Sequence, residues 1–365
     1  MSRSAAKRKV LLCGYYGEHN IGDDALLQVL LDQMPANWEP EVTAYDQEQI
    51  ENVFGIATTG RRSLVEVLEA VGHCDALVLG GGSLLQDSTS FQSLLYYAAL
   101  ILRAWLGGKP VLLWGQGLGP LSRRRSRALV WFLLRRVTLM SWRDSASYAW
   151  ATAWGNSSLL GSDPVWALTP SIWQGEGGAI VLCWREVPKL ESEGWRVLLR
   201  VLDQLVAEAD RKVLWLPFHR EQDSGLLKKL DDRGLLSPSL NNCSREVAVT
   251  TAQEAMAVFS SAGLVLAMRL HSLILAALSG SPCAALSYDP KVAAAARGVG
   301  CPCQDLADPL STRLLDDWRA TLDHPPDWER IEAQRNHALV HQQVFQLFEG
   351  RELGRDGSAK SYPQL

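Results

Sequence analysis

Arg269 and His271 are the two side chains in this sequence with the clearest capacity for chemistry. They fall in AMRLHSLILAALSG, residues 267–280, where a buried apolar strand is expected to run directly into an apolar helix. A guanidinium is always charged and fits phosphate or carboxylate, while an imidazole titrates near neutral pH. Together they are suited to hold an anionic ligand and to move a proton beside it. A structural alternative stays open, in which the arginine pairs with a carboxylate or caps carbonyls and the histidine only packs.

The expected place of His271 at a helix start bears on its affinity for a proton. We expect the strand GLVLAM to present Arg269 at its carboxyl end, and the helix to run from His271 to Gly280. The positive end of the helix dipole lowers the proton affinity of an imidazole, whereas a bound anion raises it. The sequence therefore predicts a histidine that gains a proton when an anionic ligand arrives.

A glycine-rich loop near the start of the chain is the second candidate site. In CGYYGEHNIGDDALL, residues 13–27, three glycines follow an apolar run and precede a helix-like segment. Backbone amides at such a helix N-terminus can face an anionic ligand, although the glycine spacing differs from the dinucleotide and phosphate-loop fingerprints. Asp23 in this loop is a candidate base, and it can equally be the N-cap of the helix.

Short apolar runs must position both stretches. Eight such runs alternate with longer helix-like segments, which is the pattern of parallel β-α units. The runs are KVLLCG, ALVLGGG, PVLLWGQG, VTLMSW, AIVLCW, KVLWLPF, GLVLAMRL and CAALSY. Each run ends in a glycine, an aromatic residue or a charged residue, so polar groups collect at the carboxyl ends of the strands, where open α/β sheets bind ligands. The fold class predicted is α/β with two Rossmann-like domains.

The domain boundary is expected in TPSIWQGEGG, residues 169–178, because prolines and glycines interrupt the alternation there. A length of 365 residues also exceeds one typical domain. We therefore expect an N-terminal domain over 1–170 and a C-terminal domain over 171–350. The stretch WERIEAQRNHALVHQQVFQLFEG is predicted to close the C-terminal domain as an amphipathic helix, and 351–365 is expected to be loose.

Composition narrows the functional classes. Hydrophobic residues make up 47% of the chain and charged residues 21%, which is typical of a globular protein. A net charge of -4 argues against nucleic acid as a partner. Seven cysteines without a framework spacing favour a reducing compartment, and Cys301 and Cys303 lack the companion ligands of a zinc site. We expect no metal and no cofactor.

The apolar segments are too short for a signal peptide or a spanning helix. Only four apolar residues precede the first glycine, and the longest runs, LLYYAALIL and ALVWFLL, are far below the roughly 18 residues that span a bilayer. A cytoplasmic protein is therefore expected.

A basic stretch offers a second kind of partner. In SRRRSRALVWFLLRRV, residues 122–137, arginines flank an apolar block on both sides. The four arginines before the block are Arg123, Arg124, Arg125 and Arg127, and the two after it are Arg135 and Arg136. Such a segment can dock on anionic lipid as a peripheral membrane contact. The alternative is a core helix of the first domain with solvated ends.

Several motifs together resemble one known family. They are GYYGEHNIGDDALL, GGGSLLQDSTS, GKPVLLWGQGLGPL, SWRDSAS, GSDPVW, LPFHREQD, AMRLHSLILAALSGSP and SYDPKV. Their order and spacing resemble the polysaccharide pyruvyl transferase family, and its bacterial CsaB-like branch in particular, from about Val10 to Val292. As a set these motifs are highly specific.

The resemblance implies a two-domain architecture like that of the glycosyltransferase B class. It also implies an enzyme that moves the enolpyruvyl-derived group of phosphoenolpyruvate onto a sugar, forming a pyruvate ketal and releasing phosphate. The implied acceptor is N-acetylmannosamine of a cell-wall polymer of the kind used in S-layer anchoring. That acceptor is lipid-linked or otherwise activated, so the inner face of the cytoplasmic membrane is the implied place of reaction.

The resemblance carries functional roles onto particular positions. It implies donor contacts from Arg143, Arg269 and His271, with His271 as acid or base. Asp23 would activate the sugar hydroxyl. The candidate acceptor contacts are Tyr15, Tyr16, Asn20, Arg185 and His219.

For two of these candidate acceptor contacts, a purely structural role is the alternative. Arg185 can be a rim residue in a salt bridge. His219 and Asp223, in PFHREQD, can lie in a solvated turn.

Two rival functions remain open at the level of sequence. The first is a nucleotide-sugar glycosyltransferase, since the inferred architecture supports that chemistry too. The second is a catalytically silent, anion-binding regulatory protein. The presence of Arg143, Arg269 and His271 argues against the second.

Overall fold

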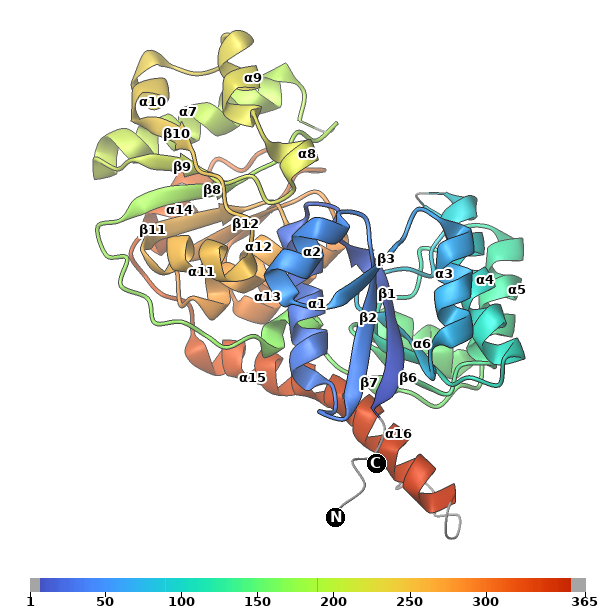
Figure 1. Ribbon diagram of the computed structural model, residues 1–365. Coiled ribbons are helices and arrows are strands. Elements are labelled where there is room, and N and C mark those ends of the chain that lie inside the picture. Colours follow the sequence, from blue (N-terminus) through green and yellow to red (C-terminus); the bar gives the residue numbers. More distant parts are fainter. Residues whose placement is uncertain (1–6, 89, 189, 356–365) are drawn as a thin grey trace. The chain divides into compact units, whose positions relative to one another are not determined.

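The computed structural model describes residues 7–88, 90–188 and 190–355 and has the predicted α/β class (Figure 1). The described chain forms two compact units, each built on one parallel sheet. Unit 1 contains the described parts of 1–18, 26–167 and 336–365, and unit 2 contains 19–25 and 168–335. The start of the first helix, residues 21–25, thus belongs to unit 2 although its later turns belong to unit 1.

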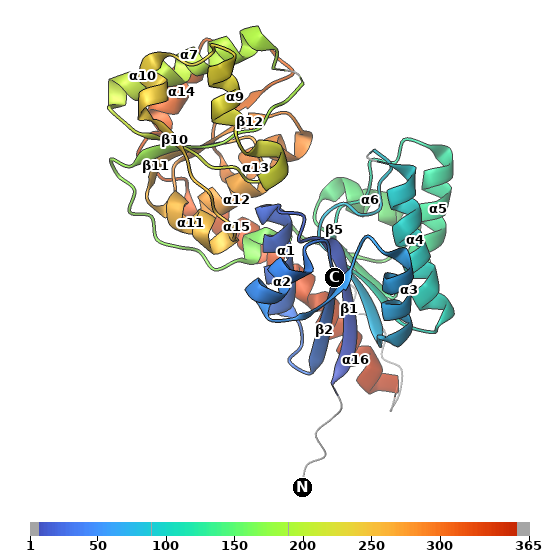
Figure 2. The same cartoon turned by 45° about the horizontal axis from the view of Figure 1, so that its top comes forward.

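Seven parallel strands form the sheet of unit 1. In spatial order they are β3 (Ala57–Gly60), β2 (Trp38–Ala44), β1 (Arg8–Tyr16), β4 (Ala76–Gly80), β5 (Val111–Gln116), β6 (Leu139–Trp142) and β7 (Leu159–Leu160). The helices are α1 (Ile21–Gln33), α2 (Gln47–Phe54), α3 (Leu64–His73), α4 (Phe91–Leu106), α5 (Arg124–Leu134), α6 (Ser145–Ala153) and the C-terminal α16 (Gln343–Arg355). Figures 1 and 2 both show α3, α4 and α5 side by side on one face of this sheet.

Six parallel strands form the sheet of unit 2. In spatial order they are β10 (Ser244–Glu246), β9 (Val213–Trp215), β8 (Ala179–Cys183), β11 (Ala262–Ala267), β12 (Cys283–Ser287) and β13 (Cys303–Asp305). The helices are α7 (Ser192–Ala209), α8 (Arg220–Asp223), α9 (Leu226–Asp232), α10 (Pro238–Cys243), α11 (Ala252–Ser260), α12 (Leu270–Leu278), α13 (Pro290–Val299), α14 (Leu314–Thr321) and α15 (Trp328–Ala338). A tryptophan cluster of Trp184, Trp195, Trp215 and Trp318 lies in the core of this unit.

All eight predicted strands are confirmed as β1, β4, β5, β6, β8, β9, β11 and β12. The five remaining strands were missed, and four of them are the outermost strands of the two sheets. Among the described residues, no helix has the length and apolar character needed to cross a membrane.

The predicted closing helix is corrected in both its form and its place. It divides into α15, a 3-10 turn over Leu339–Gln342, and α16. Residues from Asn336 onward belong to unit 1, because Phe345 and Phe348 are buried edge-on against Trp38 there. The helix also continues to residue 355, into the tail that was expected to be loose. The rest of that tail, 356–365, lies outside the described residues.

His341 connects the C-terminal segment that begins at Asn336 to the rest of unit 1 by two buried hydrogen bonds. Its ring is fully buried, and Nε2 donates to the Ser162 carbonyl at 2.7 Å while Nδ1 accepts from the Ser141 hydroxyl at 2.9 Å. Ser141 Oγ in turn accepts from the Gly115 amide at 2.9 Å. Burial lowers the pKa of His341 to about 4, so the imidazole is neutral at pH 7.

The buried imidazole makes stability depend on pH. In the folded protein His341 takes up a proton only near pH 4, whereas the unfolded chain does so near 6.5. The contribution of His341 to the free energy of unfolding is therefore fully present above pH 6.5 and is lost as the pH falls towards 4. Between pH 7 and pH 5 this one group should remove about 2 kcal/mol.

We expect His341→Gln to abolish that contribution. The thermal midpoint of the wild type should fall by about 4–8 °C more than that of the variant between pH 7 and pH 5. Differential scanning calorimetry of both proteins at each pH tests this. Equal falls in the two proteins would contradict the assignment.

Candidate functional site

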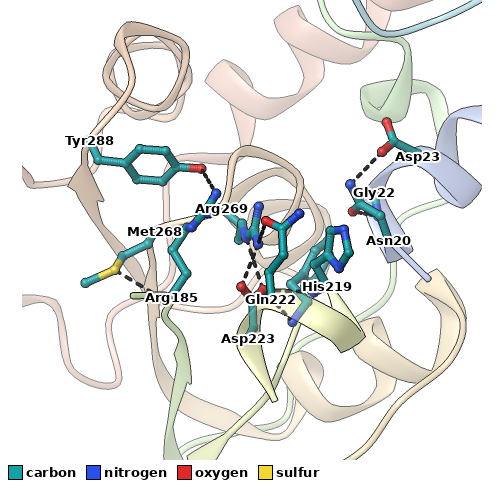
Figure 3. Close-up of polar contacts among 11 residues, drawn as sticks. Asn20, Gly22, Asp23, Arg185, His219, Gln222, Asp223, Met268, Arg269 and Tyr288 are labelled. Carbon is teal, nitrogen blue, oxygen red and sulfur yellow. Dashed lines mark hydrogen bonds and ion pairs between the residues drawn. The ribbon is translucent and has the colours of Figure 1, made fainter. Parts of the chain in front are cut away.

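The carboxyl ends of four strands in unit 2 bring candidate residues to one edge of the sheet. Arg185 follows β8, His219 follows β9, Arg269 follows β11 and Tyr288 follows β12. Because the strands are parallel, these positions share an edge, and Figure 3 shows the side chains gathered there. The sequence predicted this placement from the residues that end each apolar run.

The first loop of the chain reaches the same edge by backbone pairing. Asn20 and His219 form an antiparallel bridge, with the Ile21 amide donating to the Phe218 carbonyl at 3.2 Å and the Arg220 amide donating to the His19 carbonyl at 2.9 Å. This pairing joins residues about 200 positions apart, so no local pattern in the sequence indicates it. It brings Asn20 and Asp23 into the same unit as His219 and Arg269 (Figure 3).

Asn20, and not Asp23, caps helix α1. The Asn20 carbonyl accepts the amides of Asp23 and Asp24, both at 3.1 Å, and its side-chain oxygen accepts the Gly22 amide at 3.1 Å. The Asn20 side-chain amide donates to Asp23 Oδ2 at 2.5 Å. The alternative that made Asp23 the N-cap is therefore wrong, and Asp23 is a carboxylate in the first turn, oriented by the capping residue.

His271 lies against this loop. Helix α12 begins one residue earlier than predicted, with Arg269 at the cap position and His271 in the first turn. A Cβ atom added to Gly22 would stand 1.9 Å from His271 Nδ1, so only glycine allows the ring to lie where it does. This close approach explains the need for glycine at position 22 better than backbone conformation does.

A buried carboxylate holds Arg269. Asp223 is only 2% exposed, and its two oxygens accept from Arg269 Nε at 3.0 Å and Nη2 at 2.5 Å. Asp223 also accepts the amides of Phe218 and His219, and Gln222 accepts from Arg269 Nη2 at 3.1 Å. The alternative in which Arg269 pairs with a carboxylate is therefore confirmed, because Nε and Nη2 of its guanidinium both bind Asp223. Among the described residues Nη1 has no hydrogen-bond partner, so this nitrogen is the part of the guanidinium left for a ligand.

His219 and Asp223 do not lie in a solvated turn. Both side chains are buried, with His219 6% exposed. Burial lowers the pKa of His219, and the Arg269 guanidinium lowers it further, so the imidazole is neutral at pH 7. Within the described part of the chain, His219 Nδ1 is buried without a hydrogen-bond partner.

Arg185 differs from Arg269 in having no carboxylate beside it. Its Nη1 donates to the Tyr288 hydroxyl at 3.3 Å, and its guanidinium carbon lies 5.2 Å from the centre of the Tyr288 ring. No carboxylate pairs with Arg185 in the described chain, and its buried Nε has no hydrogen-bond partner there. The rim salt bridge considered for this residue is therefore absent from the described chain. Arg185 supplies a half-buried positive charge that phosphate or carboxylate could neutralise.

Arg143 in unit 1 is held in the same way as Arg269. It follows β6, and Nη1 donates to Asp163 at 2.8 Å while Nη2 donates to Ser83 Oγ at 3.2 Å. Both charged side chains are largely buried. The sequence placed an arginine here but gave no sign of its carboxylate partner, which lies 20 residues away.

The two tyrosines of the first loop have different environments. Tyr16 is buried and its hydroxyl donates to the Gly80 carbonyl, which corrects the expectation that it contacts an acceptor. Tyr15 is 45% exposed and has the Arg61 guanidinium 4.2 Å from its ring centre. Arg61 in turn pairs with Glu18. The sequence reasoning missed this Arg61–Glu18 support, for which adjacent arginines at 61 and 62 are the only local signal.

No three histidine, cysteine, aspartate or glutamate side chains among the described residues come together as metal ligands would.

The two parallel sheets define an α/β protein of the glycosyltransferase B fold, with polar groups at the carboxyl edge of the second sheet. Solved structures of this fold cover nearly the whole chain. UDP-N-acetylglucosamine 2-epimerase from Rickettsia bellii has a TM-score of 0.58 and 13% identity, covering 96% of this chain and 99% of its own. UDP-GlcNAc 2-epimerase from Methanocaldococcus jannaschii has a TM-score of 0.57 and 12% identity, covering 95% and 99%. MurG from Acinetobacter baumannii has a TM-score of 0.51 and 13% identity, covering 94% and 99%.

Identities this low establish the fold alone. The family is established separately, because the family described as polysaccharide pyruvyl transferase matches residues 20–290. This chain belongs to that family. No curated protein matches it in sequence.

Proposed function

We propose that this protein transfers the enolpyruvyl-derived group of phosphoenolpyruvate to a sugar of a cell-surface polysaccharide precursor, forming a pyruvate ketal. Membership of the family supports a pyruvyl transferase in general. The observation that supports an anionic donor is Arg185, whose charge no carboxylate of the described chain balances, at the edge where Arg269 and His271 also lie. N-acetylmannosamine, lipid-linked or otherwise activated, is the acceptor we propose from the family resemblance.

The reaction balances without an oxidant, a reductant or a metal. The methylene carbon of phosphoenolpyruvate takes up a proton and becomes a methyl group, which makes the neighbouring carbon electrophilic. One sugar hydroxyl attacks that carbon, phosphate leaves, and a second hydroxyl attacks to close the ketal. One hydroxyl proton replaces the proton taken by the methylene carbon, and the other departs with phosphate.

Each group at the unit 2 edge has a role in this scheme. Arg185 was expected to contact the acceptor, and we reassign it to the donor because no described carboxylate balances its charge. Together with Arg269 Nη1 it binds the anionic groups of the donor, and the Asp223 pair fixes the direction of the Arg269 fork. His271 acts as acid or base, a function that contributes about 10²- to 10⁴-fold. Asp23, oriented by Asn20, accepts the proton of the attacking hydroxyl. Arg143 is kept as a further donor contact on the family resemblance.

The remaining assignments concern the acceptor. We propose that Tyr15 stacks on the sugar ring with its exposed face, because exposed aromatic rings bind the apolar faces of sugars. His219 Nδ1 and the Asn20 side chain are proposed to bind sugar hydroxyls.

Binding of phosphoenolpyruvate by Arg185→Ala tests the donor assignment. We expect tryptophan fluorescence to show saturable binding to the wild type and about 10- to 100-fold weaker binding to this variant, which loses a charge-assisted hydrogen bond. Arg196→Ala, which removes an exposed arginine of α7, is the matched control and should bind like the wild type. Incubation with donor and saccharide should release phosphate and add the mass of pyruvate less water to the saccharide.

The glycosyltransferase alternative predicts a different pattern. Tight binding of UDP-sugars, with no response to phosphoenolpyruvate even when saccharide acceptors are present, would reject the proposal. Donor binding without turnover on any saccharide would favour the silent regulatory protein.

A further inference from the structure

Positive charge is concentrated in one segment of this acidic chain. Residues 88–143 contain nine of the 36 basic residues and none of the 40 acidic ones. The rest of the chain therefore carries 27 basic and 40 acidic residues. The segment includes α4 and α5, which pack against each other on one face of the unit 1 sheet (Figures 1 and 2).

Large apolar side chains lie exposed on the same helices and on α6. They are exposed over 36% to 74% of their surface, and they are Leu95, Trp105, Leu106, Trp131, Phe132 and Trp150. Helix α5 also has a buried face, formed by Val130, Leu133 and Leu134. One side of α5 therefore packs in the core, as expected for a core helix of the first domain. Its opposite side carries two exposed aromatic rings, Trp131 and Phe132, rather than only polar groups.

Arginines stack on these exposed rings. Arg135 lies 3.7 Å from the centre of the Trp131 ring, and Arg136 lies 4.7 Å from that of Trp105. Arg127 lies 5.7 Å from the Trp150 ring centre. We use the name arginine–aromatic face for the surface formed by these three pairs with Phe132, Leu106 and the exposed Arg123, Arg124 and Arg125.

The charges of this face are not balanced within the described chain. None of its six arginines, at positions 123, 124, 125, 127, 135 and 136, forms an ion pair with a described carboxylate. The two nearest acids in sequence are already engaged. Asp87 accepts the amides of Ser122 and Arg123, and Asp144 caps α6 through the Ser147 amide and hydroxyl. The face therefore presents cations and apolar rings together.

We infer that the arginine–aromatic face docks on a lipid bilayer that contains anionic lipid. Guanidinium groups would lie at the lipid phosphates, and the tryptophans would sit at the level of the headgroups, where such rings are enriched. A second copy of the chain is disfavoured as occupant because two such faces would bring arginine against arginine. Nucleic acid is disfavoured because the chain as a whole carries a net charge of -4 and would repel a long phosphate backbone outside this one segment.

This docking is independent of the donor site. The face consists of side chains of unit 1 that the proposed chemistry does not use, so it can be tested on vesicles that contain no saccharide. If docking occurs, a lipid-linked acceptor would be reached along the membrane surface rather than from bulk solvent.

Co-sedimentation of the full-length protein with vesicles tests the inference. We expect binding to vesicles of phosphatidylcholine with phosphatidylglycerol, weaker binding to phosphatidylcholine alone, and a loss of binding as salt is raised. The double variant Arg124→Ala/Arg135→Ala should bind about 10- to 30-fold less tightly, since each arginine near such a surface contributes about 1 kcal/mol. The control Arg196→Ala/Lys228→Ala removes two exposed charges from unit 2 and should bind like the wild type.

Other outcomes would overturn the inference. Absence of vesicle binding, equal affinity for neutral and anionic vesicles, or equal affinity of the double variant and the wild type would each reject it. If vesicle binding is absent and light scattering detects a dimer of the wild type that the double variant does not form, the face is instead an interface between two copies of the chain. Circular dichroism of both double variants verifies that they are folded. Turnover of a water-soluble acceptor should be unchanged in Arg124→Ala/Arg135→Ala, so failure of docking and failure of the proposed chemistry are measured separately.

Discussion

His271→Asn is expected to lower kcat for pyruvyl transfer by about 10²- to 10⁴-fold, with a much smaller loss of affinity for phosphoenolpyruvate, to which His271 is only one of several expected contacts. Asparagine keeps a polar group of similar reach, but it cannot take up or release a proton near neutral pH. Arg185 and Arg269, which we propose to bind the donor, stay intact in this variant. Phosphate release under saturating donor and acceptor measures kcat, and fluorescence titration measures donor affinity.

Gly22→Ala provides a matched control for the position of this histidine. Its added Cβ would stand 1.9 Å from His271 Nδ1, so the ring must move although its chemistry is unchanged. We expect kcat to fall in this variant as well, with the protein still folded. An unchanged kcat in His271→Asn would show that another group handles the proton.

Asp223→Asn is expected to reduce the free energy of unfolding of unit 2 by about 3–5 kcal/mol. The carboxylate has no exposed surface, and the Arg269 side chain is only 14% exposed. The substitution leaves a guanidinium without its counter-charge and turns an amide N–H towards its donors, which is the costly way to break a buried pair. Urea unfolding followed by the fluorescence of the tryptophan cluster of unit 2 measures the loss.

The double variant Asp223→Asn/Arg269→Gln separates charge from packing. Removing the unpaired cation should restore much of the lost stability, because two neutral amides can hydrogen-bond where a lone guanidinium cannot be satisfied. Donor affinity provides a second readout. Asp223→Asn releases the charge of Arg269, so binding of phosphoenolpyruvate should be kept in the folded protein, whereas Arg269→Gln should weaken it. A loss below 1 kcal/mol in Asp223→Asn would show that the pair contributes little.

The buried pairs change how anion binding by this protein is understood. Arg143 and Arg269 were expected as ligands for phosphate and carboxylate, yet each has an aspartate partner within hydrogen-bonding distance. A paired guanidinium attracts an anion less strongly than an isolated one, but its direction is set before the ligand arrives. Arg185 is the complement of this arrangement, with a charge that no described carboxylate balances.

The central strands were predictable because they are covered on both faces. The runs that became β1, β4, β8 and β11 are nearly continuous in apolar residues, as buried parallel strands must be. The strands that were missed, such as ATTG in β3 and CQD in β13, lie at sheet edges, are short and keep polar side chains. Their pairing depends on a neighbouring strand far away in sequence, and no local pattern records it.

The closing helix shows the same limit. Its apolar residues were recognised, but the pattern could not say which sheet they would cover, and the choice depends on Trp38, which lies more than 300 residues earlier. The sequence by itself determined the α/β class and the strand ends that carry Arg185, His219, Arg269 and Tyr288, since hydrophobic period and turn residues are local. It also predicted the start of helix α12 to within one residue. Only the tertiary structure decided which arginines have a carboxylate partner. Asp223, which neutralises Arg269, lies 46 residues away in the sequence. The neutral partner of Arg185 is Tyr288, which lies 103 residues away. Electrostatic partners are chosen by distance in space, and that distance exists only once the sheets have formed.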